Sequence, residues 1–185
     1  WDKDVGMQRE IHNIQNSPFR TKFEGILSEM TGTAAIGCIS DTDPQPLLIR
    51  SRLGVYAICT IGVINNAEEL IRTHLAYSGG HFDSMTGGKV NSNELIAAII
   101  DQKESFAEGI RFAQDMIEGT ASILILKDGG HLIAARDKMG RLPIVIERNE
   151  GGYAVTFEDY AGEKLGYDVV RELDPGEIVE ITPDG

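Results

Sequence analysis

Cys38 and Cys59 carry the two thiols of the chain, and a thiol can act as a nucleophile, bind a metal ion or form a disulfide. Both cysteines lie in apolar, strand-like stretches of sequence, which favours buried free thiols over a disulfide or a metal site. The four histidines are not spaced like ligands of one metal ion, so the sequence predicts no zinc site. We therefore expect no metal and no cofactor, and we assign no catalytic role to these side chains.

The stretch from Gly54 to Leu70 is the most distinctive arrangement of residue types in the chain. It begins with an apolar run typical of a strand, continues through an expected tight turn at Gly62, and ends in a helical pattern. Asn65 or Asn66 is expected to cap that helix, because an asparagine side-chain oxygen can accept a hydrogen bond from an unpaired backbone N–H. The sequence thus predicts a strand, a glycine turn and a capped helix in direct succession.

Composition limits the classes of partner. The chain has 185 residues, enough for one domain with a substantial core. Its 17 basic and 29 acidic residues give a net charge of -12, which argues against nucleic acid or an anionic membrane as partner, because binding phosphate requires clustered Lys and Arg. No apolar run approaches the ~20 residues of a membrane span, and no signal peptide is visible, so we predict a cytoplasmic protein.

The first two thirds of the chain mix helical and extended patterns. We expect helices over 19–30, 66–77, 93–100 and 104–118, a small apolar strand over 34–39, and a hairpin formed by 47–50 and 55–59. A polar, glycine-rich loop is expected over 78–93, and Ser92 or Asn93 is expected to cap the helix that follows it.

From Gly119 onward the sequence is typical of strands joined by tight turns. The expected strands are 121–127, 131–136, 144–148, 153–157 and 177–181. The segment from Arg136 to Arg141 is expected to form a hairpin turn with Gly140 at positive φ. Helices between two groups of strands predict an α+β fold with helices packed on antiparallel sheets.

Six short motifs resemble those of the class II glutamine amidotransferases, and they occur in the same order and at similar spacing. They are Gly37 with Gln45-Pro46-Leu47, Asn66 to Leu70, Asn91 to Glu94, Gly119 to Ser122, Ala135 to Gly140, and Leu173 to Ile178. Each motif is weak alone, but together they make a specific resemblance over nearly the whole chain. Within that family the chain is most similar to the amidophosphoribosyltransferases, which transfer ammonia from glutamine to phosphoribosyl pyrophosphate in purine biosynthesis.

The resemblance implies the four-layer αββα sandwich of the N-terminal-nucleophile hydrolases, apparently without its first strands. It implies one amidotransferase domain over residues 1–185, as a fragment of a longer protein whose N-terminal Cys nucleophile precedes Trp1. A downstream phosphoribosyltransferase-type domain is then expected, with glutamine or another small metabolite as ligand. Such enzymes are commonly homo-oligomers, so the resemblance also points to self-association.

The chain departs from the family at three positions that handle glutamine. Ile61 stands where the family has an oxyanion-hole Asn, although the N–H of Gly62 remains. The family's Arg that holds the glutamine carboxylate is missing, because the loop between Gly37 and Gln45 is shortened around residues 41–43. Ser92 replaces the Asp that receives the glutamine amine. Losing one oxyanion donor typically costs about 3–4 kcal/mol of transition-state stabilisation, and a buried carboxylate without a cation binds poorly.

These three losses at one pocket predict a domain that is degenerate for glutamine hydrolysis. The predicted remnant of the oxyanion and glutamine pocket comprises Thr60, Ile61, Gly62, Asn91, Ser92 and Asn93, with no catalytic residue. Taken singly, Ile61 could instead be a core residue at a strand end and Ser92 a helix cap. Two alternatives remain for the whole domain: an active amidohydrolase of altered specificity with its Cys upstream, or a non-catalytic metabolite-binding or structural module.

Overall fold

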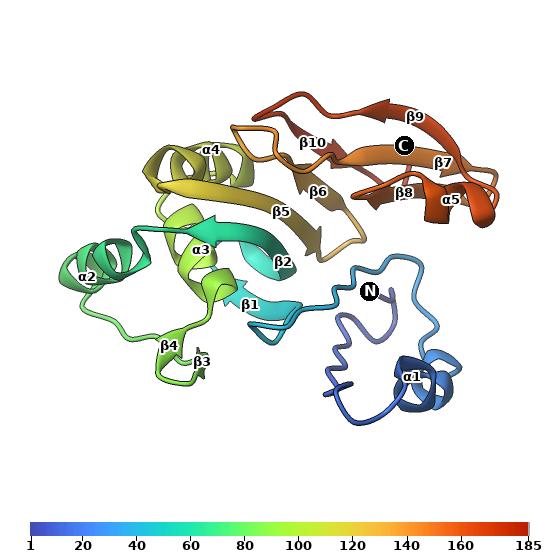
Figure 1. The fold of residues 1–185 in the computed structure, drawn as a ribbon, viewed down its shortest axis with the longest axis horizontal. Helices are drawn as coiled ribbons and strands as arrows, with labels where there is room; N and C mark the ends of the chain where they lie inside the picture. The colour runs from blue at the N-terminus through green and yellow to red at the C-terminus, as the bar shows by residue number, and fades with distance from the viewer. Residues whose placement is uncertain (185) are drawn as a thin grey trace.

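A five-stranded antiparallel sheet forms the centre of the computed structural model, which describes residues 1–184 (Figure 1). Its strands lie in the order β1-β2-β5-β6-β10. Their bounds are β1 Leu47–Ser51, β2 Gly54–Ile64, β5 Gly119–Lys127, β6 Leu132–Ala135 and β10 Ile178–Ile181. The two longest strands, β2 and β5, pair from Tyr56 opposite Lys127 to Ile64 opposite Gly119. The pairing holds the long β2 strand in one register along almost its whole length.

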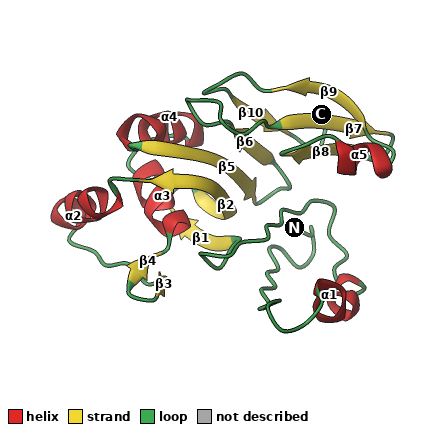
Figure 2. Ribbon diagram, viewed as in Figure 1, coloured by secondary structure: helices red, strands yellow, loops and turns green. Residues whose placement is uncertain are grey.

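Helices cover one face of this sheet (Figure 2). They are α2 Ala67–Ser78, α3 Ser92–Ile100 and α4 Phe106–Met116. Leu95, Ile96 and Ile110 on the helices form one apolar cluster with Ile58 and Ile123 of the sheet. Each of these five side chains is at most 2% exposed. Because burying a side chain of this size contributes about 1.5–3 kcal/mol, this contact is a main source of stability.

A three-stranded sheet in the order β8-β7-β9 packs against the opposite face of the central sheet. Its strands are β7 Val145–Asn149, β8 Gly152–Thr156 and β9 Asp168–Glu172. Ile146 and Leu173 pack against Ala134 and Leu124, whose side chains alternate with those that face the helices. The two sheets therefore share a second, smaller apolar core.

A short helix, α5 Tyr160–Lys164, lies against the outer face of the small sheet. A Cβ placed on Gly162 would lie 2.0 Å from Oε1 of Glu147 on β7, so the helix backbone lies directly against the Glu147 side chain. The resulting order of layers is helix, sheet, sheet, helix. The predicted α+β fold of αββα type is confirmed.

The residues before β1 form an irregular segment that contains one helix, α1 Phe19–Leu27. The predicted strand over 34–39 is wrong, because this stretch pairs with no neighbouring strand in the described structure. The backbone nitrogen of Trp1 donates a 2.6 Å hydrogen bond to the Ala34 carbonyl in this stretch. The first helix also ends three residues before the predicted Met30.

Four elements were not expected from the sequence. The predicted loop over 78–93 contains a small hairpin, β3 Met85–Thr86 with β4 Lys89–Val90. Neither α5 nor β9 was predicted. Every residue of β9 is exposed, so it lacks the alternation of apolar and polar residues that reveals a half-buried strand.

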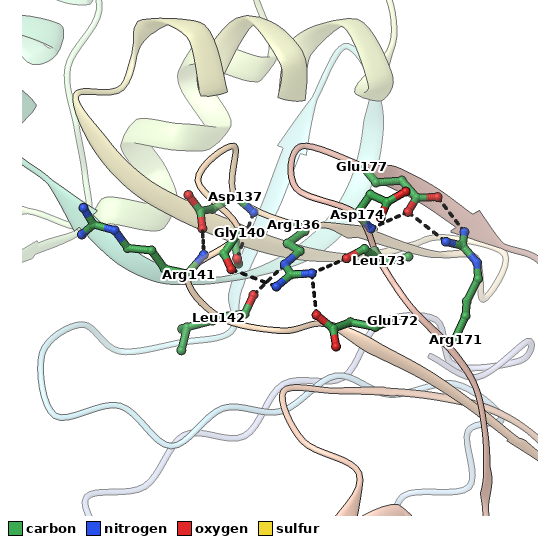
Figure 3. Close-up of polar contacts among 11 residues, drawn as sticks. Arg136, Asp137, Gly140, Arg141, Leu142, Arg171, Glu172, Leu173, Asp174 and Glu177 are labelled. Carbon is green, nitrogen blue, oxygen red and sulfur yellow. Dashed lines mark hydrogen bonds and ion pairs between the residues drawn. The ribbon is translucent and has the colours of Figure 1, made fainter.

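The segment from Arg136 to Arg141 joins the two sheets, so the prediction of a hairpin there is wrong (Figure 3). The guanidinium of Arg136 donates hydrogen bonds to the carbonyls of Leu142, Gly140 and Leu173, and it pairs with Glu172 at 2.6 Å. These contacts tie the crossing segment to the end of β9. Gly140 does have positive φ, at 63°, as predicted.

Candidate functional site

A pocket of about 190 Å³ lies between the edge of β2 and the start of α3. Its walls are the loop 38–43, residues 60–62 of β2, and Ser92 with Ile96 of α3. Four of the six predicted pocket residues, namely Thr60, Ile61, Gly62 and Ser92, therefore line one cavity. The structure also brings the loop 38–43 to this cavity.

The edge of β2 beside the pocket offers backbone groups to a ligand. Pairing between β1 and β2 extends to Leu47 opposite Ile58, and beyond that point β2 pairs with β5 alone among the described strands. The Thr60 N–H donates to Oε1 of Gln45 at 2.9 Å, so Thr60 faces the unpaired side. Because backbone N–H directions alternate along a strand, the N–H of Gly62 points the same way, toward the pocket.

Gly62 belongs to β2, so the predicted tight turn at this residue is wrong. Its φ is 154°, and a Cβ added there would lie 2.0 Å from the Thr120 carbonyl oxygen. Gly119 on the partner strand shows the same close approach, because its Cβ would lie 1.9 Å from the Val63 carbonyl oxygen. Two glycines thus let β2 and β5 approach closely beside the pocket.

Asn91 and Asn93, at the start of α3, are buried at 2% and 0% exposure and do not line the pocket. The Oδ1 atom of Asn91 accepts hydrogen bonds from the backbone N–H of Asn93 at 2.8 Å and from its side-chain amide at 3.1 Å. Asn91 also donates to the Pro44 carbonyl. The cap of α3 is therefore Asn91, and the prediction of Ser92 or Asn93 as the cap is wrong. Through these hydrogen bonds, both asparagines stabilise the start of α3.

Asp43 was not singled out from the sequence, yet its carboxylate lies at the N-terminus of α3. Its Oδ2 accepts a 3.0 Å hydrogen bond from the Ser92 N–H. The positive end of a helix dipole and its unpaired N–H groups favour such an anion. The only sequence signal near this contact was the shortened loop before Gln45, which includes Asp43.

The charge of the pocket is entirely acidic. Among its lining residues in the described part of the chain, the charged side chains are Asp41 and Asp43, with no Lys, Arg or His. Ile61 contributes an apolar surface and is 38% exposed, so packing in the core does not account for it. Since Asn91 caps α3, a capping role does not account for Ser92 either.

The two cysteines come from the two segments that border the pocket, β2 and the loop 38–43. Cys59, on β2, is buried and Cys38 is half-buried in the pocket lining; both are free within residues 1–184, as predicted, although Cys38 is less buried than expected. The neighbouring Cys59 thiol lowers the pKa of Cys38 to about 7. The Cys38 thiol, together with burial, raises the pKa of Cys59 above its ordinary value.

A larger cavity of about 640 Å³ lies next to the pocket, between the N-terminal segment and the central sheet. Its lining is mostly apolar and includes Phe19 and Phe23 of α1 and Leu48, Ala57 and Leu126 of the sheet. The two cavities share residues 38–40 as a common wall. Any movement of this loop therefore changes both spaces.

Two searches of the described residues bear on ligands and membranes. Residues 1–184 contain no group of three or more His, Cys, Asp or Glu side chains arranged to hold a metal ion. Among the helices of that same range, none is both long enough and apolar enough to cross a membrane. The cytoplasmic location and self-association stay predictions.

Comparison with known proteins agrees with the fold. The model of the glutamine amidotransferase domain family matches residues 27–159. The amidophosphoribosyltransferase of Methanocaldococcus jannaschii is 33% identical over 74% of this chain and 28% of its own length. That of Synechocystis is 31% identical over 99% of this chain and 37% of its own length. The chain thus spans about a third of the length of these relatives.

Solved structures give the same result. The glutamine phosphoribosylpyrophosphate amidotransferase of Bacillus subtilis, complexed with ADP and GMP, superposes with a TM-score of 0.73 at 25% identity. The superposition covers 91% of this chain and 37% of that one. The resemblance predicted from six short motifs is confirmed. With the family model matching well over half of its residues, this chain belongs to the glutamine amidotransferase domain family.

Proposed function

We propose that this chain is a glutamine amidotransferase-type domain, related to that of the amidophosphoribosyltransferases, which has lost the ability to hydrolyse glutamine. The observation that carries the proposal is the charge of the pocket beside Gly62. Its charged lining residues in the described chain are Asp41 and Asp43, so the α-carboxylate of glutamine meets two carboxylates and no cation.

Electrostatic repulsion disfavours binding of the glutamine carboxylate in this pocket. At a separation of about 6 Å and an effective dielectric constant near 20, two like charges repel by roughly 3 kcal/mol. A bound carboxylate also loses hydration that only a positive partner can replace. The start of α3 offers no such replacement, because Asp43 already accepts the Ser92 N–H.

The oxyanion hole supports the same proposal. Ile61 has no donor to offer to a developing negative charge, while the backbone N–H of Gly62 supplies one. Removing one of two donors lowers the rate by about 10²–10³-fold. Ile61 lowers the rate of the chemical step, whereas the acidic lining weakens glutamine binding. Because these are different steps, the two factors multiply in their effect on glutamine hydrolysis.

The decisive experiment measures glutamate and ammonia released from glutamine by the full-length protein, with the Bacillus subtilis relative as positive control. We expect no release above the background without enzyme, and no heat of glutamine binding by titration calorimetry. Release at a rate within about tenfold of the control would overturn the proposal.

We further propose that residues 1–185 act as one amidotransferase-type domain beside a phosphoribosyltransferase-type domain. The length of the relatives, about three times that of this chain, supports this. A whole protein of this kind would use free ammonia in place of glutamine, in a step of purine biosynthesis. Consumption of phosphoribosyl pyrophosphate by the full-length protein with ammonium salts, and not with glutamine, is the expected result. Consumption with neither would refute this part.

A second candidate, a small-metabolite-binding module, is favoured by the acidic lining of a cavity that still exists. Such a pocket suits a primary amine that has no carboxylate. A suitable probe is 4-aminobutanamide, which is glutamine without its carboxylate, with glutarate as the anionic control. Thermal stabilisation by the amine alone supports binding, since a ligand that binds the folded state raises its stability. Ammonia release from the same probe would instead favour the amidohydrolase of altered specificity.

A further inference from the structure

Residues 43–45, which we call the strap, join the loop beside the pocket to the start of α3 and to the edge of β2. The Asp43 carboxylate accepts a hydrogen bond from the Ser92 N–H at 3.0 Å. The Pro44 carbonyl accepts one from the side-chain amide of Asn91 at 3.1 Å. Two successive strap residues are therefore fixed to the N-terminal end of α3 by hydrogen bonds.

The third strap residue, Gln45, is fixed to the edge of β2. Its Oε1 atom accepts a hydrogen bond from the Thr60 N–H at 2.9 Å, and both residues line the pocket. Beyond Ile58, β2 pairs only with β5 among the described strands, so a backbone N–H on its other edge needs a different partner. The Gly62 N–H, on the same edge, faces the pocket. Gln45 therefore occupies one of two neighbouring backbone donors at the pocket and leaves the other to a ligand.

The group that Gln45 offers to β2 is a primary carboxamide, which is also the side-chain group of a glutamine ligand. A ligand carboxamide that approaches this edge must compete with Gln45 for the Thr60 N–H. An internal group has a high effective concentration at its site, so it displaces a weakly bound solute. The Asp43 carboxylate occupies the Ser92 N–H in the same way. The strap thus carries a carboxylate and a carboxamide, the two groups at the two ends of glutamine.

We propose that the strap is an autoinhibitory element, in which the carboxamide of Gln45 blocks the pocket edge of β2 against primary carboxamide ligands. This rests on the proposed function only in treating the pocket as the remnant of a glutamine pocket. The ligand class is an uncharged amide, because Asp41 and Asp43 in the lining repel anions. Once Gln45 is removed, the N–H groups of Thr60 and Gly62 lie about 6.6 Å apart along one strand edge, so a short diamide can bind both.

The first test compares two backbone amides of the full-length protein by hydrogen exchange, measured by NMR and corrected for intrinsic rates. We expect the Thr60 N–H to exchange at least about tenfold more slowly than the Gly62 N–H, because Gln45 covers only the former. In Gln45→Ala the two amides should exchange at similar rates. In Gln45→Glu, which keeps an acceptor oxygen at the same position, Thr60 should stay protected. Equal exchange of the two amides in the unaltered protein would overturn the proposal.

The second test adds pentanediamide, an uncharged molecule with a primary amide at each end, and follows the melting temperature. We expect a rise for Gln45→Ala and none for the unaltered protein or for Gln45→Glu, since a ligand that binds the folded state raises its stability. Equal stabilisation of all three proteins, or of none, would overturn the proposal. If Gln45→Ala does not fold, the exchange rates of Thr60 and Gly62 in the unaltered protein decide. Glutamine hydrolysis contradicts the proposed function, whereas equal exchange of these two amides contradicts this inference alone.

Discussion

The carboxylate of Asp43 accepts a hydrogen bond from the backbone N–H of Ser92, at 3.0 Å and at the first residue of α3. A helix N-terminus is a natural place for a ligand anion, because its N–H groups are unpaired and the dipole favours negative charge. In this chain a side chain of the protein itself occupies that place. The negative charge of Asp43 at this helix N-terminus therefore makes the pocket unfavourable for the carboxylate of an amino acid.

We predict that Asp43→Asn will make the pocket more tolerant of anions while weakening α3. Loss of the charge at the helix N-terminus should lower the free energy of unfolding by about 0.3–1 kcal/mol. In the same variant, glutarate should raise the melting temperature, whereas it should leave that of the unaltered chain unchanged. Differential scanning fluorimetry measures both effects.

Asp41→Asn is the matched control, because it removes the same charge from the same pocket without touching the Ser92 hydrogen bond. We expect it to leave the free energy of unfolding within about 0.5 kcal/mol of the original value. Equal destabilisation by both variants would show that the contact between Asp43 and Ser92 contributes nothing particular to α3.

We predict that Ile61→Asn alone will not restore glutamine hydrolysis in the full-length protein. The change supplies a donor at the oxyanion position, but the pocket lining in the described chain still contains no cation for the substrate carboxylate. Because Ile61 is 38% exposed, the free energy of unfolding should change by less than about 0.5 kcal/mol. The measurement is glutamate release over time. Turnover restored by this single change would mean that the acidic lining does not exclude glutamine.

We predict that Gly62→Ala will be strongly destabilising and will distort the pocket edge of β2. Its Cβ would meet the Thr120 carbonyl oxygen at 2.0 Å, and its φ of 154° is also unfavourable for alanine. Overpacking of this kind typically costs about 1–3 kcal/mol, in addition to the backbone strain. Urea unfolding gives the difference in free energy.

Gly54→Ala is the control that introduces backbone strain without a steric clash of the new Cβ. Gly54 also has positive φ, at 110°, but within the described structure no heavy atom outside its chain neighbours lies within 4 Å of its added Cβ. It should therefore cost only the strain, about 1 kcal/mol. If the two variants lose the same stability, the close approach of β2 and β5 is not what requires glycine at residue 62.

Local patterns predicted most of the fold. The strands that became β1, β2, β5, β6, β7, β8 and β10 were all expected from apolar runs with glycine between them, and α2, α3 and α4 from helical spacing. The strand expected over 34–39 failed because an apolar run forms a strand only where another strand offers a ladder. β9 was missed because its pairing with β7, and not a pattern in its own sequence, makes it a strand. Its residues are all exposed, Val169 and Val170 included, so apolar and polar residues do not alternate along it.

The candidate site was predicted less completely. The positions of Thr60, Ile61, Gly62 and Ser92 followed from motif order, which fixes where a strand edge and a helix start meet. Asp43 could not be found in this way, because its role depends on a loop that carries it 49 residues back to α3.

We predict that Glu180 makes the fold sensitive to acid. Its carboxylate, on β10, accepts a 2.7 Å hydrogen bond from Lys127 at the end of β5 and lies 2.9 Å from Nδ1 of His131 in the turn before β6. These partners, Lys127 first, hold the pKa of Glu180 below its ordinary value of 4.5. Because the pKa is lower in the folded than in the unfolded chain, the carboxylate stabilises the fold above pH 4.5. That contribution is lost as the pH falls through the folded value.

Urea unfolding of the original chain and Glu180→Gln between pH 7 and pH 3 measures this. The variant should be less stable at pH 7, and the difference should shrink below pH 4.5. Glu180 is 42% exposed, so solvent screens the pair and the effect should be small and weaker still in high salt. Glu29→Gln, on the exposed segment after α1, removes the same charge as a control and should give a constant difference. A difference for Glu180→Gln that is equally constant with pH would mean that its pKa is the same in the folded and unfolded chains.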